Sequence, residues 1–421
     1  MQPHALPRLS DLPRPLLTII ILNLTLGICY LGFLAKVARD GDLWRADFTS
    51  FYTGWSMVLE GEGERLYDLE LQQDYQQRIL VGRNFKDGLL PYVNPPHSTL
   101  PFVPLALLSR TQAHIVWMVL NAGLLIYLIR RALYVVRDWS TLERWALVSS
   151  IVAFPALYTS FLVGAFSLLV TAALLNCYIA LEEGRDRQAA CWLFLATVKF
   201  QLVLLPALWL FGARRWRAVL WGLGLTMSAI ILTGLLFGWQ VWADYVEVLR
   251  VHNQAYNYRG MFPEETYSLK GALALLFGQP AYSPIVAITT AIFVGAGASA
   301  LWLGQRDRQG SATGRALSFG LASVLGLAFN LHLYLHDLLL VLVPGMLFFL
   351  YLRRSGLPTR RYATFALLAP LVAFGAEMTL QTRLGIQIPV ILLFILLGWM
   401  VRAYAAGTGG QQPVPAPPPD A

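Results

Sequence analysis

Apolar segments of roughly 20 residues, long enough for an α-helix to cross a bilayer, recur along this 421-residue chain and limit its possible folds. Charged residues form only 13% of the chain, whereas about 25% is usual in soluble proteins. A transmembrane β-barrel would instead alternate apolar and polar residues in segments of about ten. We therefore predict an all-α, polytopic integral membrane protein with about twelve transmembrane helices.

The apolar segments form one predicted transmembrane domain, residues 16–404, which long polar segments interrupt at residues 39–112 and 239–283. Residues 1–15 are a polar N-terminal segment, and the Gly/Pro/Gln-rich residues 405–421 are expected to be a disordered tail. Basic residues gather in short loops, which are usually retained in the cytoplasm. We expect both termini inside and both long polar segments outside. The net charge of +8 thus orients helices and does not indicate nucleic-acid binding.

One apolar stretch, residues 188–211, can be interpreted in two ways. As a single span it would place the arginines at 214–217 outside and reverse every later basic loop as well. Two short half-helices that turn at residues 198–201 keep all of these loops in the cytoplasm. We adopt the second interpretation, which gives twelve spans and places Lys199 at the outer face.

The first outer segment carries Asp47 shortly after the first apolar segment. A partly desolvated carboxylate at a membrane edge can act as a general base on an acceptor hydroxyl. The alternative is that Asp47 only caps the helix that follows it. The spacing of Phe51, Trp55, Val58 and Leu59 predicts that this helix is amphipathic and lies on the membrane surface.

Other unusual polar residues also fall at outer ends of spans, where ionisable groups are costly and often mark a site. Lys199 either binds a lipid phosphate as a point charge or extends its amine to the interface. On a helix, His332 and His336 would share one face, but no third ligand has suitable spacing for zinc. With Asp337 they can hold a phosphate and sugar hydroxyls, or simply form a polar turn.

Several short motifs together resemble glycosyltransferase family 87, a group of C-type enzymes that includes mannosyltransferases using polyprenyl-phosphate mannose in actinobacterial envelopes. No single motif is diagnostic, and the resemblance rests on their order and separation over about residues 16–400. The motifs are residues 46–52, 60–61, 66–68, 91–96, 198–201, 214–217 and 332–337.

The resemblance implies a membrane enzyme with a C-type glycosyltransferase fold in the bacterial inner (plasma) membrane, with its active site on the periplasmic face. It implies inverting transfer of a hexose such as mannose from a polyprenyl-phosphate sugar to an envelope glycolipid or glycan, without a nucleotide-sugar donor. Asp47 is then the catalytic base. The expected donor-binding residues are Lys199, Gln201, His332, His336 and Asp337, and the expected acceptor or secondary residues are Tyr52, Asp68 and His97.

We expect neither a metal nor another cofactor, and the expected partners are the two substrates and membrane lipids.

Two other functions fit parts of the pattern. A transporter or lipid flippase also has many spans and broken helices, although the two halves of this chain show no similarity to each other. A non-catalytic partner in envelope-polymer assembly would use Asp47 only structurally.

Overall fold

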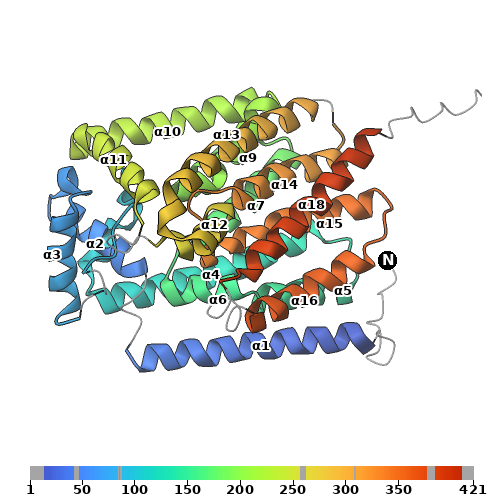
Figure 1. Cartoon of the computed structure of the whole chain (residues 1–421), viewed down its shortest axis with the longest axis horizontal. Coiled ribbons are helices and arrows are strands. Elements are labelled where there is room, and N and C mark those ends of the chain that lie inside the picture. The colour runs from blue at the N-terminus through green and yellow to red at the C-terminus, as the bar shows by residue number, and fades with distance from the viewer. Residues whose placement is uncertain are drawn as a thin grey trace, which may run out of the picture.

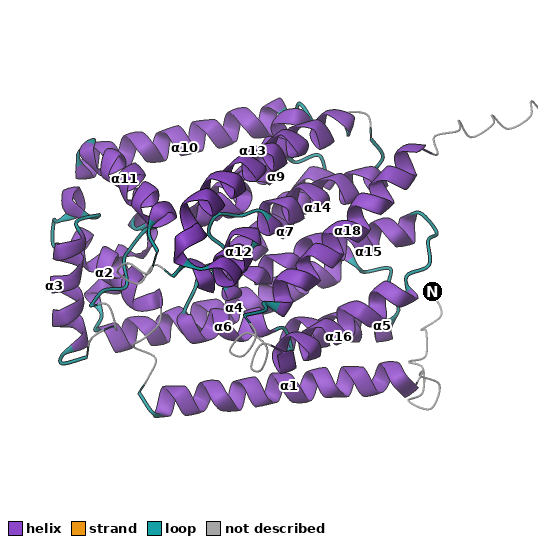
Figure 2. Cartoon of the chain, viewed as in Figure 1, coloured by secondary structure: helices purple, strands orange, loops and turns teal. Residues whose placement is uncertain are grey.

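The computed structural model describes residues 14–41, 47–83, 85, 88–256, 262–307, 310–376 and 385–409. Within these ranges the chain contains helices and loops but no strands (Figure 2). The long helices run side by side along one axis of the molecule (Figure 1). These features confirm the prediction of an all-α, polytopic membrane protein.

Seven helical segments in the described ranges are long and apolar enough to cross a membrane, although one of them, α8 to α9, turns back at Lys199. An eighth span is possible if α5 and α6, bent by 43°, cross as one unit. The predicted count of twelve is therefore not confirmed. The seven segments are α1 (Arg14–Arg39), α4 (Arg110–Val135), α8 to α9 (Asp186–Gly212), α10 (Trp216–Phe237), η8 with α13 (Gln279–Arg306), η9 with α15 (Leu335–Arg354) and α18 (Ile388–Gly409).

The remaining described helices are shorter. Three of them, α7 and α14 and part of α16, are apolar but have fewer than 18 residues by the same test. Their bounds are α5 (Thr141–Val152), α6 (Pro155–Val163), α7 (Ser167–Glu182), α14 (Ala312–Ala328) and α16 (Arg360–Ala376), and, in the two long polar segments, α2 (Asp47–Leu59), η3 (Gly63–Arg65), α3 (Leu69–Leu80), η4 (Pro96–Ser98), η5 (Leu100–Leu107), α11 (Gln240–Gln254), η7 (Pro263–Glu265) and α12 (Leu269–Phe277).

Most residues of the two predicted terminal segments, 1–15 and 405–421, lie outside the described residues. Residues 1–13 and 410–421 belong to this part, so the expected disordered tail is described only over residues 405–409. Those five residues continue helix α18.

The stretch from α8 (Asp186–Leu195) through η6 (Ala196–Lys199) to α9 (Phe200–Gly212) reverses direction. Arg215 Nη1, just beyond α9, lies 3.4 Å from Asp186 Oδ1 at the start of α8. A straight helix of this length would separate its two ends by about 40 Å. Lys199 has φ −127° and ψ 65°, outside the helical region, at the junction of η6 and α9. The two ends of the stretch thus share one side, as the split into half-helices predicts.

Ion pairs join the polar loops at one end of the bundle. Arg315 Nε lies 2.9 Å from Glu182 Oε1, and Arg354 Nη1 lies 3.3 Å from Glu182 Oε2. Arg353 pairs with Glu143 in the same way. The start of α1 lies at this end in Figure 1, whereas α2, α3 and α11 lie at the opposite end. The arginine-rich loops and the two long polar segments therefore occupy opposite ends, as charge distribution predicts.

Helix α2 is buried inside the protein, so the prediction that it lies on the membrane surface is wrong. Ten of its positions are buried. Trp55 packs against Phe102 of η5, with ring centroids 5.4 Å apart, and against Trp117 of α4 at 5.7 Å. The spacing of apolar residues identified a helix, but it could not show that η5 and α4 cover the face that was expected to meet lipid.

Candidate active site

A cavity of about 700 Å³ lies among the segments that the two long polar regions and the half-helix turn bring together. It is open to the exterior and has both apolar and polar walls. Among the described residues, its ionisable and amide-bearing walls come from α2, the loop before η4, η6, α9, α11, η7 and residues 331–337. These walls include Asp47, Asn94, Lys199, Gln201, Arg250, His252, Asn253, Glu265, His332, His336 and Asp337.

A chain of polar contacts crosses one wall of this cavity. The Lys199 ammonium lies 2.7 Å from Asp337 Oδ1 and 3.0 Å from His336 Nε2. Ser167 Oγ donates a hydrogen bond of 2.7 Å to the same Asp337 oxygen. His336 Nε2 also lies 3.6 Å from Asp47 Oδ2. The structure thus brings Asp47, Lys199, His336 and Asp337 together, and it adds Ser167. We call these five residues the charged cluster.

Asp337 differs from Asp47 in how much freedom its carboxylate has. Its side chain is 1% exposed and is held by Lys199 and Ser167, so removing either charge of this pair would leave the other buried and unpaired. The Asp47 side chain is 31% exposed, and 3.6 Å is its closest ion-pair distance in the described part of the chain. Asp337 is therefore suited to positioning Lys199, and Asp47 to accepting a proton from a bound molecule.

The loop between α6 and α7 positions the start of α2. Gly164 has φ +67°, and a Cβ there would lie 2.9 Å from Cβ of Phe48, the residue after Asp47. The Gly164 carbonyl accepts a 2.7 Å hydrogen bond from Trp117 Nε1 of α4. A left-handed conformation without a side chain lets this loop approach α2 closely. The turn therefore packs against the start of α2 beside Asp47, and the helix that follows it begins with Ser167, which contacts Asp337.

His332 lies apart from the charged cluster, contrary to the prediction that it shares a helix face with His336. Residues 331–334 are irregular, and η9 (Leu335–Val341) begins only at Leu335. The Asn330 side chain shapes this segment, because its Oδ1 accepts from the His332 amide at 2.8 Å and its Nδ2 donates to the Gln201 carbonyl at 2.9 Å. The His332 ring instead packs edge-on against His252 of α11, with centroids 3.9 Å apart.

Tyr52, Asp68 and His97 do not line the cavity among the described residues. The Tyr52 hydroxyl donates to the Leu108 carbonyl at 2.7 Å. Asp68 caps α3 by accepting from the amides of Glu70 and Leu71. His97 Nε2 lies 3.0 Å from Thr197 Oγ1, and burial lowers the pKa of His97 to about 4. Each makes contacts that explain its place in the fold.

The structure adds Ser167, His252 and Tyr334 to the polar residues around the cavity. Ser167 gives no signal in the sequence because a serine at the start of a helix is common. His252 lies in the second long polar segment, 80 positions before His332 in the numbering. The only sequence signal for His252 would have been a histidine within a helix whose other residues look exposed.

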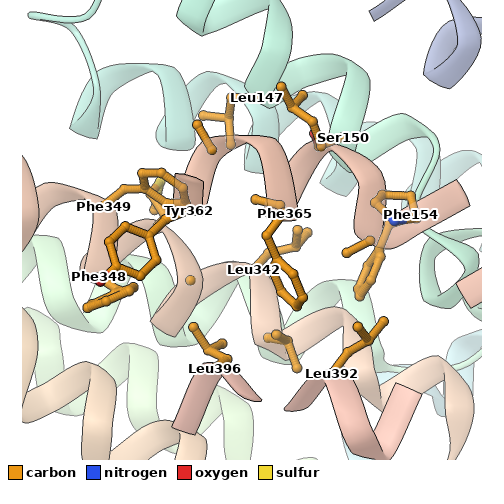
Figure 3. A pocket seen from close by; sticks show the side chains of 18 of the residues that line it. Leu147, Ser150, Phe154, Leu342, Phe348, Phe349, Tyr362, Phe365, Leu392 and Leu396 are labelled. Carbon is orange, nitrogen blue, oxygen red and sulfur yellow. The ribbon is translucent and has the colours of Figure 1, made fainter. Parts of the chain in front are cut away.

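A second cavity of about 250 Å³ lies between α5, α6, η9, α15, α16 and α18. Its walls are mostly apolar; Figure 3 shows Phe154, Leu342, Phe365 and Leu392 around it. Leu335 lines both this apolar cavity and the polar one. The two cavities are therefore neighbours on either side of residues 335–338.

A family model, glycosyltransferase family 87, matches residues 92–328, which is more than half of the chain. The chain belongs to glycosyltransferase family 87. Neither the curated proteins nor the solved structures compared with it gave a match. The family assignment confirms the resemblance seen in the sequence and establishes this family 87 protein as a membrane glycosyltransferase. The matched residues include Lys199 and His252, whereas Asp47, His332 and His336 lie outside them.

Proposed function

We propose that this family 87 glycosyltransferase transfers a hexose such as mannose from a polyprenyl-phosphate sugar to an envelope glycolipid or glycan. The reaction takes place on the external face of a bacterial inner membrane and inverts the anomeric centre. The observation that carries the proposal is the shared cavity of Asp47, Lys199 and His336. This cavity is bordered by α2 and α11, at the end of the bundle opposite the arginine-rich loops.

In the proposed reaction, the acceptor hydroxyl gives its proton to the Asp47 carboxylate. Its oxygen attacks the anomeric carbon from the face opposite the phosphate, and the bond from that carbon to the phosphate oxygen breaks. The products are the new glycoside and polyprenyl phosphate. A single displacement of this kind inverts the configuration. The exposure of Asp47, at 31%, leaves room for a hydroxyl to reach it.

Lys199 is proposed to stabilise the negative charge that develops on the leaving phosphate. An ammonium has three N–H groups, and Asp337 and His336 accept two of them. Among the described residues no other group accepts from this ammonium, so its third N–H can contact a phosphate oxygen. The lining cations Lys199 and Arg250 do not outnumber the lining carboxylates Asp47, Glu265 and Asp337. Phosphate binding must therefore depend on local hydrogen bonds rather than on a large positive field.

The neighbouring apolar cavity supports a lipid-linked substrate. It begins at Leu335, beside the charged cluster, and extends along α15 to Arg353 at the opposite end. A polyprenyl chain needs an apolar surface next to the site that holds its phosphate. A transporter or flippase would use similar cavities, but the family assignment favours transfer of a sugar.

The test is sugar transfer by the purified protein in liposomes, with radiolabelled polyprenyl-phosphate mannose as donor and membrane glycolipids as acceptor. Asp47→Asn should lower the rate by at least about a hundredfold, because general-base catalysis contributes a factor of this size. Donor binding should remain. Asp74→Asn is the matched control, because Asp74 is an exposed carboxylate on α3 of the same polar segment and does not line the cavity. A fully active Asp47→Asn protein would exclude the proposed base.

A further inference from the structure

We propose that His252 and His332 form a separate subsite of the cavity that binds sugar hydroxyl groups and selects the sugar. Nothing in the family match assigns this role, and His252 does not belong to the charged cluster. The inference deepens the proposed function and depends on it only for the identity of the molecule that carries the sugar.

Two segments far apart in the sequence build this subsite. His252 lies near the end of α11, and His332 lies in the irregular segment before η9. Their rings meet at 81° with centroids 3.9 Å apart, and both residues line the cavity. The Tyr334 hydroxyl lies 3.5 Å from His252 Nε2. Imidazole and phenol groups are thus concentrated in one part of the wall, where the Tyr334 ring also stacks on His336 of the charged cluster with centroids 5.7 Å apart.

The ring nitrogens of these histidines are buried but lack hydrogen-bond partners. Within the described residues, this holds for Nδ1 of His252 and for both Nδ1 and Nε2 of His332. The His252 residue is 7% exposed. Buried polar atoms are nearly always hydrogen-bonded, and leaving one unpaired costs free energy. Three such atoms beside one cavity indicate a ligand that completes their hydrogen bonds.

The electrostatic surroundings keep both imidazoles neutral. Burial and, to a smaller extent, the nearby Lys270 side chain together lower the pKa of His252 to about 3. Burial also places the pKa of His332 well below its ordinary value, with added effects of His252 and Lys270. A neutral imidazole has one donor and one acceptor nitrogen. This combination matches a hydroxyl group, which both donates and accepts, better than it matches a phosphate.

Lys270 also positions a further polar group at the subsite. Its ammonium, in a residue that is 1% exposed, donates to Asn253 Oδ1 at 2.8 Å. This contact orients the Asn253 carboxamide, and Asn253 lines the cavity directly after His252. An amide beside two neutral imidazoles is a common kind of polar wall for sugar recognition, because each group can exchange hydrogen bonds with hydroxyls.

A metal ion suits these residues less well than a sugar hydroxyl does. Zinc sites in proteins usually have three or four protein ligands, and in the described ranges no three His, Cys, Asp or Glu side chains are arranged so that they could hold a metal ion. Two histidines alone would hold an ion weakly. Zinc binding is therefore a contrary outcome of the test rather than part of the proposal.

The test measures equilibrium binding by the full-length protein in a detergent that contains no sugar. The probes are polyprenyl phosphate alone, the same lipid phosphate carrying mannose, glucose or galactose, and octyl glycosides of these sugars. In the wild type, the difference in affinity between the sugar-bearing lipid and the bare lipid phosphate measures sugar recognition. The variants are His252→Phe with His332→Phe, which removes the ring nitrogens but retains aromatic bulk, and His332→Gln, which retains a donor and an acceptor.

We expect the double phenylalanine variant to lose about tenfold or more in sugar-dependent affinity, the size of two ordinary hydrogen bonds. Binding of bare polyprenyl phosphate should stay within about twofold, and His332→Gln should retain an intermediate affinity. A loss confined to the sugar-bearing lipids assigns the subsite to the donor. A loss confined to octyl glycosides assigns it to the acceptor.

His114→Phe is the matched control, because His114 is also buried with an unpartnered Nε2, yet it lies against Phe48 and does not line the cavity. It should bind every probe as the wild type does. Unchanged sugar-dependent affinity in the double variant, or stoichiometric zinc binding that the double variant loses, would overturn the inference. A wild type that binds octyl glycosides through these histidines but no polyprenyl lipid would retain the subsite and refute the proposed donor.

Discussion

The carboxylate of Asp337 lies 2.7 Å from the ammonium of Lys199, 138 positions earlier in the sequence. One residue comes from the first turn of η9 and the other from the break between two half-helices. Both side chains are at least nine-tenths buried. The contact therefore fixes the half-helix turn against the bundle and holds a cation at the wall of the cavity.

Removing either member of this pair should destabilise the protein, because the remaining charge is buried without its partner. We expect Lys199→Met or Asp337→Asn to cost about 3–5 kcal/mol in unfolding free energy. The double variant should recover most of that loss, since it leaves no unpaired charge. Transfer activity should remain at least about a hundredfold reduced in the double variant, because the phosphate has lost its cation.

The measurements are thermal unfolding in detergent and initial transfer rates for the two single variants and the double variant. Additive losses of stability would contradict the coupling. An active double variant would remove Lys199 from phosphate stabilisation.

The reversal between α8 and α9 predicts that Arg187 and Arg214 face the same side of the membrane. Single cysteines at these positions, in a protein without Cys29, Cys177 and Cys191, should both react with an impermeant maleimide only from the cytoplasmic side. A cysteine that replaces Glu62, in the outer polar segment, is the control and should react from outside. Labelling of positions 187 and 214 from opposite sides would show that residues 186–212 cross the membrane once.

The apolar cavity predicts a dependence on the length of the donor lipid. Gly345 lines this cavity, and a Cβ at that position would meet nothing within 4 Å. Gly345→Phe should therefore fold normally while filling the space. We expect KM to rise about tenfold for a long polyprenyl donor, as loss of buried apolar contact implies, and to change little for a donor with a two-isoprene chain. An equal effect on both donors would show that the cavity does not hold the lipid chain.

Lys270 predicts a stability that depends on pH. Burial lowers the pKa of its ammonium to about 7, below the usual value near 10.4 of an unfolded chain. Between these two values the unfolded chain binds more protons, so unfolding free energy should rise with pH and level off above pH 10. Lys270→Met should remove this rise. Melting temperatures of both proteins from pH 7 to pH 10 check this prediction, and parallel curves would contradict the lowered pKa of Lys270.

The sequence by itself determined where the helices are and which polar residues are unusual. Runs of apolar residues predicted helical spans, since a bilayer requires about 20 residues of helix, although the predicted count of twelve is not confirmed; the arginine-rich loops indicated the direction of the spans. The same argument indicated the turn at Lys199, because only a reversal keeps residues 214–217 with the other basic loops. The family was predicted from the order of short motifs, because each motif can be identified in the sequence without knowledge of the fold.

Only the tertiary structure decided which surfaces meet. The apolar face of α2 was assigned to lipid, yet η5 and α4 cover it, because helical spacing records that a face is apolar but not what buries it. His332 and His336 were placed on one helix face, yet the Asn330 side chain holds residues 331–334 in an irregular path. His332 therefore meets His252, and that contact depends on packing between distant segments rather than on any local pattern.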